Sequence, residues 1–184
     1  MAAPVLETER LTLRGFVSDD VTAFAQVLAD REAMWDLWSL PGVPDDELDY
    51  AKLFIEPSIK SWRTAGYGFW AVCIRAPALG PPGELIGFCG FVDAEEANCD
   101  RDTELEVGWG IRPDYQGRGL ASEAAKATID WAFANLDRRR LVAITDFRNK
   151  ASRKLMERLG FTRAGVSLAY GVPAVRYTLS RPAP

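Results

Sequence analysis

Histidine is absent from the 184-residue sequence, and this absence excludes more chemistry than any other feature of its composition. Without imidazole the chain lacks the commonest general base and the His ligands of most catalytic zinc sites. Its three cysteines, Cys73, Cys89 and Cys99, are odd in number and form no C-x-x-C pair, which argues against a disulfide framework or a four-thiolate metal site. A catalytic base must therefore be a carboxylate, a tyrosine or an ordered water, and we expect no metal.

Two further absences bear on where the protein works and what it binds. Lys and Arg number 22 against 26 Asp and Glu, so the net charge of −4 provides no basic field for nucleic acid or an anionic membrane. The longest strongly apolar run, 69–74, is far shorter than the ~20 residues of a membrane-spanning helix, and residues 1–10 lack the pattern of a signal peptide. We expect a cytoplasmic protein that binds neither membranes nor, directly, nucleic acid.

The remaining composition is that of one globular domain. Hydrophobic residues make up 48% of the sequence and charged residues 26%, a balance typical of soluble globular proteins. At this length, folding buries roughly 70% of the surface of the unfolded chain, which suffices for a core without disulfides. We therefore predict a single domain over residues 1–184.

The succession of hydrophobic patterns predicts alternating strands and helices. Along the chain we expect a strand at 10–16, a helix after Ser18 to about 30, an irregular stretch at 31–46, a helical stretch at 45–64 broken near Pro57, strands at 67–75, 84–93 and 104–111, a helix at 120–136, a strand at 138–147, a helix at 149–160, and strands at 161–170 and 174–179. This order predicts an α/β (α+β) fold in which a mixed sheet carries helices on both faces.

Residues 116–121, QGRGLA, connect a predicted strand to a strongly predicted helix. Two glycines there expose successive backbone N–H groups at the helix start, where unpaired donors and the helix dipole favour an anion. The segment is neither a Walker A loop, which needs Gly-Lys-Ser/Thr, nor a Rossmann fingerprint, which follows its strand directly. An ordinary flexible turn is the alternative interpretation.

Four segments in the same order resemble one enzyme family. The segment ELEVGWGIRPDYQGRGLASEA, residues 104–124, resembles the acetyl-CoA-binding motif Q/R-x-x-G-x-G/A of the GNAT acyltransferase superfamily. LETERLTLRGF near the start, YGFWAV with GELIGFCGF in the middle, and NKASRKLMERLGF near the end resemble its RimJ/RimL-like branch, known for acetylating ribosomal-protein amino termini. The resemblance covers nearly the whole chain and implies a GNAT-type mixed, mainly antiparallel central sheet of about seven strands, flanked by helices on both faces.

The resemblance also implies where acetyl-CoA binds. The motif begins at Gln116, which belongs to the cofactor site. The backbone N–H groups of the residues that follow would hold the pyrophosphate, namely those of Gly117, Arg118, Gly119, Leu120, Ala121 and Ser122. Backbone groups of Trp109, Gly110 and Ile111 would pair with the pantetheine arm and polarise the thioester carbonyl. Asn149 and Ser152 match a family N-x-x-S pattern that contacts the pantetheine and the sulfur, and Arg153 or Lys154 would meet the nucleotide phosphate. Asn149 is equally suited to cap a helix.

Glu106 is the expected general base. On a strand, Glu104, Glu106, Gly108 and Gly110 share one face, so Glu106 can face the cleft that the thioester would occupy. A structural hydrogen bond or ion pair is the alternative role for this carboxylate, and it could also act through water. Many family members carry a tyrosine acid seven residues after the asparagine, where this chain has Met156. We therefore expect Ser152 to donate a hydrogen bond to the thiolate, with water as a candidate proton source.

The expected acceptor is a primary amine. At pH 7 an α-amine is roughly 10% neutral and a lysine only about 0.04%, so a modest base favours an N-terminal α-amine. Segment 93–106 carries seven acids and one base, opposite a basic phosphate end, which suits a cationic acceptor, although a solvated surface loop is the plainer interpretation. Trp35 and Trp38 form either a wall of the acceptor site or a plug over the core.

Other interpretations stay open at this stage. The acceptor could be a small-molecule amine such as an amino acid, a polyamine or an antibiotic. The chain could also be a non-catalytic acyl-CoA-binding module, although the presence of a strand carboxylate speaks against this. We expect a monomer or homodimer whose partners are acetyl-CoA and the amine.

Overall fold

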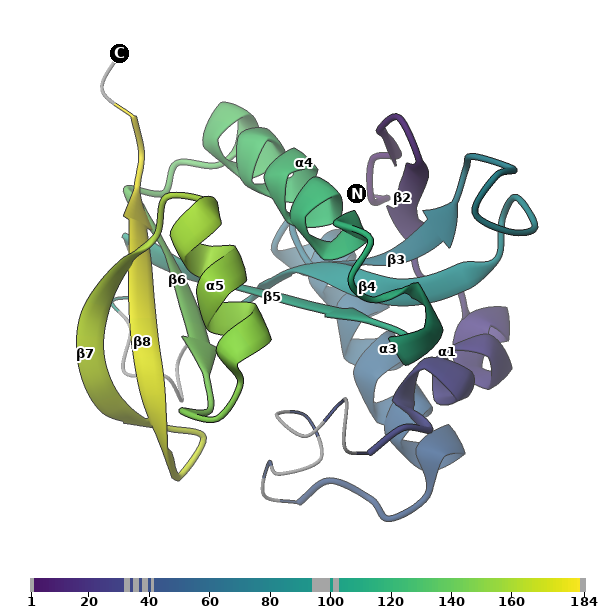
Figure 1. The fold of residues 1–184 in the computed structure, drawn as a ribbon, viewed down its shortest axis with the longest axis horizontal. Coiled ribbons are helices and arrows are strands. Elements are labelled where there is room, and N and C mark those ends of the chain that lie inside the picture. Colours follow the sequence, from purple (N-terminus) through teal and green to yellow (C-terminus); the bar gives the residue numbers. More distant parts are fainter. Residues whose placement is uncertain are drawn as a thin grey trace.

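The computed structural model describes residues 2–31, 34, 37, 40, 42–93, 100 and 103–182 (Figure 1). The elements follow one another as β1 (Leu6–Glu7), β2 (Leu11–Gly15), the 3₁₀ helix η1 (Ser18–Asp20), α1 (Val21–Leu28), α3 (Glu47–Thr64), β3 (Phe69–Ile74), β4 (Leu85–Val92), β5 (Glu104–Ile111), the 3₁₀ helix η3 (Pro113–Tyr115), α4 (Leu120–Asn135), β6 (Arg140–Thr145), α5 (Lys150–Arg158), β7 (Thr162–Ala169) and β8 (Val172–Ser180). The predicted element order is confirmed, with one additional short strand, β1, at the start.

The described residues form one eight-stranded sheet in the order β1-β2-β3-β4-β5-β6-β8-β7. Every neighbouring pair is antiparallel except β5 and β6, which run parallel. The predicted class, a mixed and mainly antiparallel sheet between helices, is therefore confirmed.

Helices cover both faces of this sheet, with α4 and α5 in front and α1 and α3 behind in the view of Figure 1. Strand β3 shows why two layers form, because successive side chains of a strand point to opposite faces. Trp70 and Val72 join the core cluster that contains Leu120 and Ile129 of α4. Their neighbour Ala71, with Cys73, joins the cluster that contains Phe24 of α1 and Ile55 of α3.

The predicted break of the second helix at Pro57 is wrong. A proline inside a helix removes one backbone hydrogen bond and disfavours the preceding turn, which is why a break was expected. The structure instead has one helix, Glu47–Thr64, that runs through Pro57. Its buried face, which includes Ile55 and Trp62, packs on the sheet on both sides of the proline, so tertiary packing offsets the local cost.

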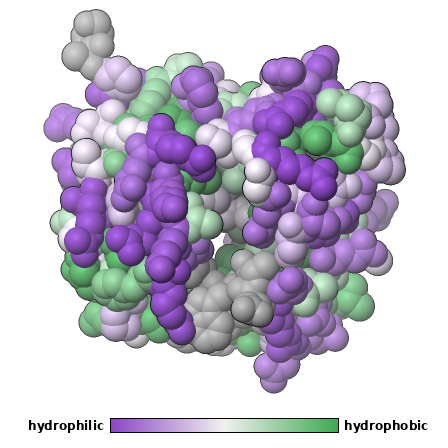
Figure 2. Space-filling model, viewed as in Figure 1, coloured by the Kyte–Doolittle hydropathy of each residue, from purple (hydrophilic) through white to green (hydrophobic). Residues whose placement is uncertain are grey.

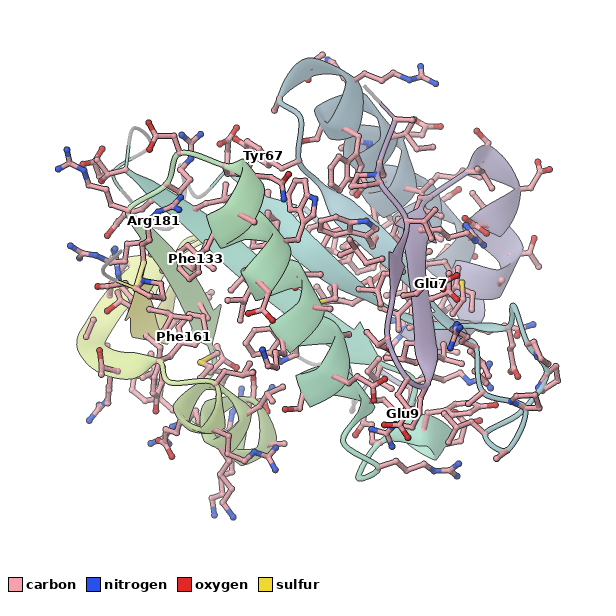
Figure 3. The ribbon with its side chains drawn as sticks, turned by 90° about the horizontal axis from the view of Figure 1, so that it is seen from above. Glu7, Glu9, Tyr67, Phe133, Phe161 and Arg181 are labelled. Atoms are coloured by element: carbon pink, nitrogen blue, oxygen red, sulfur yellow. The ribbon has the colours of Figure 1, made fainter. Side chains whose placement is uncertain are left out.

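The C-terminal end of α4 is held by the residue that follows β8. Arg181 donates hydrogen bonds to the carbonyl groups of Phe133 and Leu136, and its guanidinium lies over the Phe133 ring (Figure 3). A cation is favourable at this end of a helix because the last carbonyls carry partial negative charge. Within the described residues, none of the helices combines the length and the apolar character needed to cross a membrane.

Candidate active site

The sheet divides between β5 and β6, and a large cavity lies at this division. The register of the two strands runs from Glu104↔Arg140 to Glu106↔Val142. Beyond it, β5 continues to Ile111 alongside β4, and β6 continues to Thr145 alongside β8. A cavity of about 1270 Å³ lies along this division, and Figure 2 shows the surface hollowed between the half that carries α5 and the half that carries α1.

The cavity wall brings together most of the residues predicted from the sequence. It includes Glu106, Trp109, Gly110, Ile111, Gln116, Gly117, Gly119, Leu120, Ala121, Ser122, Asn149 and Ser152. Arg118 differs, because its guanidinium donates to the Asp114 carbonyl at 3.0 Å and lies over the Tyr115 ring. Trp35 and Trp38 lie outside the described residues. So do 94–99, 101 and 102, which form most of the acidic loop.

The glycine turn before α4 has the shape of an anion cradle. Gly117 and Gly119 have φ values of +72° and +77°, in the left-handed region that favours glycine. Gly119 is also the N-cap of α4, so no side chain caps the first turn of this 16-residue helix. Gln116 secures the turn, because its Nε2 donates to the Ile111 carbonyl at 2.8 Å. Gly117, Gly119 and Leu120 line the cavity, so a helix start without a side-chain cap, a usual place for an anion, lies at its wall.

The C-terminal part of β5 offers a backbone edge to the same cavity. Residues Val107 to Ile111 pair with β4 on one side, while the other side lies beyond the register with β6 and lines the cavity. Gly110 is required here, since a Cβ would come within 2.4 Å of the Phe88 ring. An extended molecule can add to such an edge as a further strand through main-chain hydrogen bonds.

Glu106 is a buried carboxyl group in the cavity wall, with only 8% of its surface exposed. Burial raises its pKa from 4.5 to about 7, although a hydrogen bond from Tyr170 and the charge of Arg176 act in the opposite direction. The Tyr170 hydroxyl donates to Glu106 Oε2 at 2.5 Å. A carboxyl with a pKa near 7 is divided between its two protonation states at neutral pH, as a general base requires.

The second carboxylate on this face of β5 has a different environment. Glu104 forms ion pairs with Arg176 at 2.6 Å and with Arg140 at 3.2 Å, and it accepts a hydrogen bond from the Asp100 backbone. Glu104 therefore forms the ion pairs on this face of β5, whereas Glu106 accepts the hydrogen bond from Tyr170. Among the described residues, no group of three or more His, Cys, Asp or Glu side chains is arranged to hold a metal ion.

Helix α5 brings polar and basic groups to the other side of the cavity. Asn149 caps this helix, because its side-chain oxygen accepts from the Ser152 N–H at 2.9 Å. Both residues also line the cavity, so the capping role does not remove them from the site. Arg153 lies with Lys150, Lys154 and the carboxylate Glu157 around a small adjoining depression of about 290 Å³, where cations outnumber the one acid.

Two features of the cavity were missed in the sequence. Phe54 of α3 lines it in ring contact with Phe69 and Phe88, with ring centroids 4.9 Å apart in both cases. Phe69 begins strand β3 and packs against the core, as a predicted strand at 67–75 implies, but it also faces the cavity, which the sequence did not indicate. Tyr170 was assigned to a strand end, and only the Tyr-Gly pair between two predicted strands could have indicated a turn at this position.

Comparison with known proteins identifies the class of enzyme. Residues 10–162 match the family described as the acetyltransferase (GNAT) domain, so the chain belongs to the GNAT family of acetyltransferases. It resembles the uncharacterized N-acetyltransferase p20 of Bacillus licheniformis, with 26% identity over 166 residues, 90% of this chain and 86% of that protein. This chain is therefore an acyl-CoA-dependent N-acetyltransferase.

Two further comparisons agree. The chain is 28% identical over 157 residues to the putative ribosomal N-acetyltransferase YdaF of Bacillus subtilis, covering 85% of this chain and 80% of that protein. The crystal structure of an acetyltransferase from Agrobacterium tumefaciens has a TM-score of 0.75 and 28% identity, covering 97% of this chain and 95% of that one. The predicted family is confirmed.

Proposed function

We propose that this enzyme transfers the acetyl group of acetyl-CoA to the N-terminal α-amine of a protein or peptide, with Glu106 as the general base. The observation that carries the proposal is the Glu106 carboxyl in the cavity wall, where β5 and β6 part, with its pKa raised to about 7. Because that value lies about one unit below the ordinary pKa of an α-amine, proton transfer between them is nearly balanced. The ordinary pKa of a lysine side chain is roughly three units above that of Glu106, so proton transfer from lysine is much less favourable.

The described residues fit acetyl-CoA as the acyl donor. The left-handed glycines of the turn present backbone N–H groups suited to a pyrophosphate, and the edge of β5 from Trp109 to Ile111 suits the amide-rich pantetheine arm. The basic depression that includes Arg153 supplies cations for the nucleotide phosphate. Acetyl-CoA supplies the activated acyl group, and the chain's own residues orient it and handle the proton.

The reaction then needs one carbon–nitrogen bond formed and one carbon–sulfur bond broken. The neutral amine attacks the thioester carbonyl, whose oxygen accepts from backbone N–H groups of β5. Glu106 takes the proton that the nitrogen loses. The sulfur departs as a thiolate, which the Ser152 hydroxyl stabilises by a hydrogen bond before water protonates it.

The apolar wall on the α3 side supports a peptide acceptor with an apolar first residue. Leu37, Val43, Leu53, Phe54 and Phe69 line the cavity there. A polyamine carries several positive charges, which would need several available carboxylates. Besides Glu106, the cavity lining includes Asp93, Asp146 and Glu157, which are bound to Tyr67, Arg148 and Tyr177 respectively. The wall on the α3 side offers hydrocarbon and aromatic surface instead. A peptide needs one site for its amine and an apolar surface for its first side chain, which the cavity provides.

The test measures thiol release from acetyl-CoA in the presence of matched amines. One set contains peptides with a free apolar N-terminus, the second contains the same peptides N-blocked but with an internal lysine, and the third contains spermidine and free amino acids. We expect release with the first set alone, and a roughly 10²-fold loss of kcat/KM in Glu106→Gln with acetyl-CoA affinity retained in calorimetry. Turnover with polyamines alone would contradict the peptide acceptor. Binding of acetyl-CoA without turnover on any amine would indicate a non-catalytic module.

A further inference from the structure

The turn between β7 and β8 has an unusual residue at its tip. The last register pair of the two strands is Ala169↔Val172, so Tyr170 and Gly171 form a two-residue hairpin loop. Their φ values are +52° and +77°, as in a type I′ turn. Glycine suits this conformation, but Tyr170 is the only residue other than glycine with positive φ in the described part of the chain. A bulky residue held in this region commonly has a functional reason.

The conformation of Tyr170 brings its hydroxyl group to the base. Strand β8 pairs with β6 as far as Thr145↔Val175, so the tip of the hairpin extends past the end of β6 toward the division of the sheet. Tyr170 lines the cavity there, and its hydroxyl lies 2.5 Å from Glu106 Oε2. This length is typical of a hydrogen bond from a hydroxyl to a charged carboxylate.

We infer that Tyr170 is a positioning residue for the reaction: its O–H fixes Glu106 Oε2 in the cavity wall and stabilises the carboxylate that accepts the amine proton. This inference rests on the proposed role of Glu106 as general base. The hydroxyl acts through Glu106, and the strained turn is the structural means that carries it there.

The charged groups near Glu106 are Glu104 on the same strand, Arg140 on β6 and Arg176 on β8, and Asp93 follows the end of β4, whose last residue pairs with Glu106. Arg140 and Arg176 both pair with Glu104. Asp93 accepts a hydrogen bond from Tyr67. Tyr170 therefore gives Glu106 a direct hydrogen bond from a neutral donor, and it lowers the pKa of Glu106 more than the charge of Arg176 does.

Removal of the hydroxyl should shift the pH dependence of the reaction in a defined direction. Without the donor the Glu106 carboxylate is less stable, so its pKa rises and more alkaline solution is needed to ionise it. An increase of about one pH unit, the size expected for a hydrogen bond to a charged group, leaves about a tenth of the base ionised at pH 7 instead of half.

The first experiment compares kcat/KM of Tyr170→Phe and wild type from pH 6 to 10 on one α-amine substrate. Their ratio cancels the titration of the amine itself. We expect a roughly fivefold loss at pH 7 that falls below about 1.5-fold at pH 9.5. The matched control is Tyr67→Phe, which removes a tyrosine-to-carboxylate hydrogen bond at Asp93. It should leave the acid limb of the pH profile of kcat/KM at the same pH as in wild type. A Tyr170→Phe loss of equal size at every pH would overturn the inference.

A second experiment separates the inference from the proposed function. In ¹³C NMR of protein labelled at glutamate carboxyls, the Glu106 resonance is assigned by its absence in Glu106→Gln. We expect it to titrate at higher pH in Tyr170→Phe than in wild type, and an unchanged midpoint would overturn the hydrogen bond's role. A shifted midpoint in a protein that acetylates no amine would reject Glu106 as the base, and with it the positioning role. In the Glu106→Gln background, Tyr170→Phe should cause no further loss of kcat/KM, whereas an additive loss would count against action through Glu106.

Discussion

Replacement of Glu106 by glutamine is expected to stabilise the protein while it removes activity. The carboxyl binds its proton more tightly in the folded chain, with a pKa of about 7, than in the unfolded chain, where the ordinary value is 4.5. Folding stability from this group is therefore fully present below pH 4.5 and is lost as the pH rises through about 7. Glutamine has nearly the same shape, its carbonyl oxygen can accept from Tyr170, and it never ionises.

The magnitude follows from the two pKa values. The interval between 4.5 and about 7, at about 1.4 kcal/mol per pH unit, corresponds to about 3 kcal/mol at pH 8, as an order of magnitude. Urea unfolding of wild type and Glu106→Gln at pH 4.5, 6, 7 and 8 measures this difference in the free energy of unfolding. We expect nearly equal free energies of unfolding at pH 4.5 and a variant more stable by about 3 kcal/mol at pH 8.

Glu104→Gln is the matched control on the same face of β5. Its carboxylate is paired with Arg176 and Arg140, so its removal leaves cations without their partner and should destabilise the protein by roughly 2–4 kcal/mol at pH 7. Both substitutions replace a glutamate by glutamine, but they are expected to change the free energy of unfolding in opposite directions. If Glu106→Gln is no more stable than wild type at pH 8, then burial of the charged Glu106 carboxylate does not destabilise the fold. Burial would then fail as the explanation of the raised pKa of Glu106.

Two further predictions concern the turn and the cysteines. Gly119→Ala should weaken acetyl-CoA binding in calorimetry roughly tenfold, because an L-residue at φ +77° strains the turn by about 1–2 kcal/mol. The control is Gly66→Ala, since Gly66 has a φ of +78° but lies outside the cavity. This variant should lose similar stability but retain its affinity for acetyl-CoA. Brief alkylation of the native protein, read by mass spectrometry, should leave Cys73 and Cys89 unmodified. Both are buried, and burial raises the pKa of the Cys89 thiol to about 12. Rapid labelling of either cysteine, or unchanged acetyl-CoA affinity in Gly119→Ala, would contradict these expectations.

The local patterns of the sequence predicted most of the fold. Period-two alternation and the cap before α5 are properties of neighbouring residues, so the element order could be read directly. Strand β1, Leu6–Glu7, was missed because two residues are too few to show an alternation. The helix through Pro57 was missed because its continuity depends on packing against distant strands, which local propensity does not contain.

The residues that line the cavity were predictable where one continuous segment contains them. The turn from Gln116 to Ser122 and the face of β5 are each continuous in sequence, so spacing sufficed to nominate them. The difference between Glu104 and Glu106 was not predictable, because it depends on Arg176 and Tyr170, which are more than sixty residues away along the chain. Their proximity is a consequence of the order β5-β6-β8 in the sheet.

The short register between β5 and β6 has a mechanical consequence. Three residue pairs, Glu104↔Arg140 to Glu106↔Val142, join the β1–β5 part of the sheet to the β6–β8 part. A donor molecule that binds the β5 edge on one side and α5 on the other would span this junction and tie the two parts together. Occupancy by the donor is thus expected to slow hydrogen exchange in β6 and α5 and to stiffen the walls before the acceptor arrives, which favours an ordered sequence of binding.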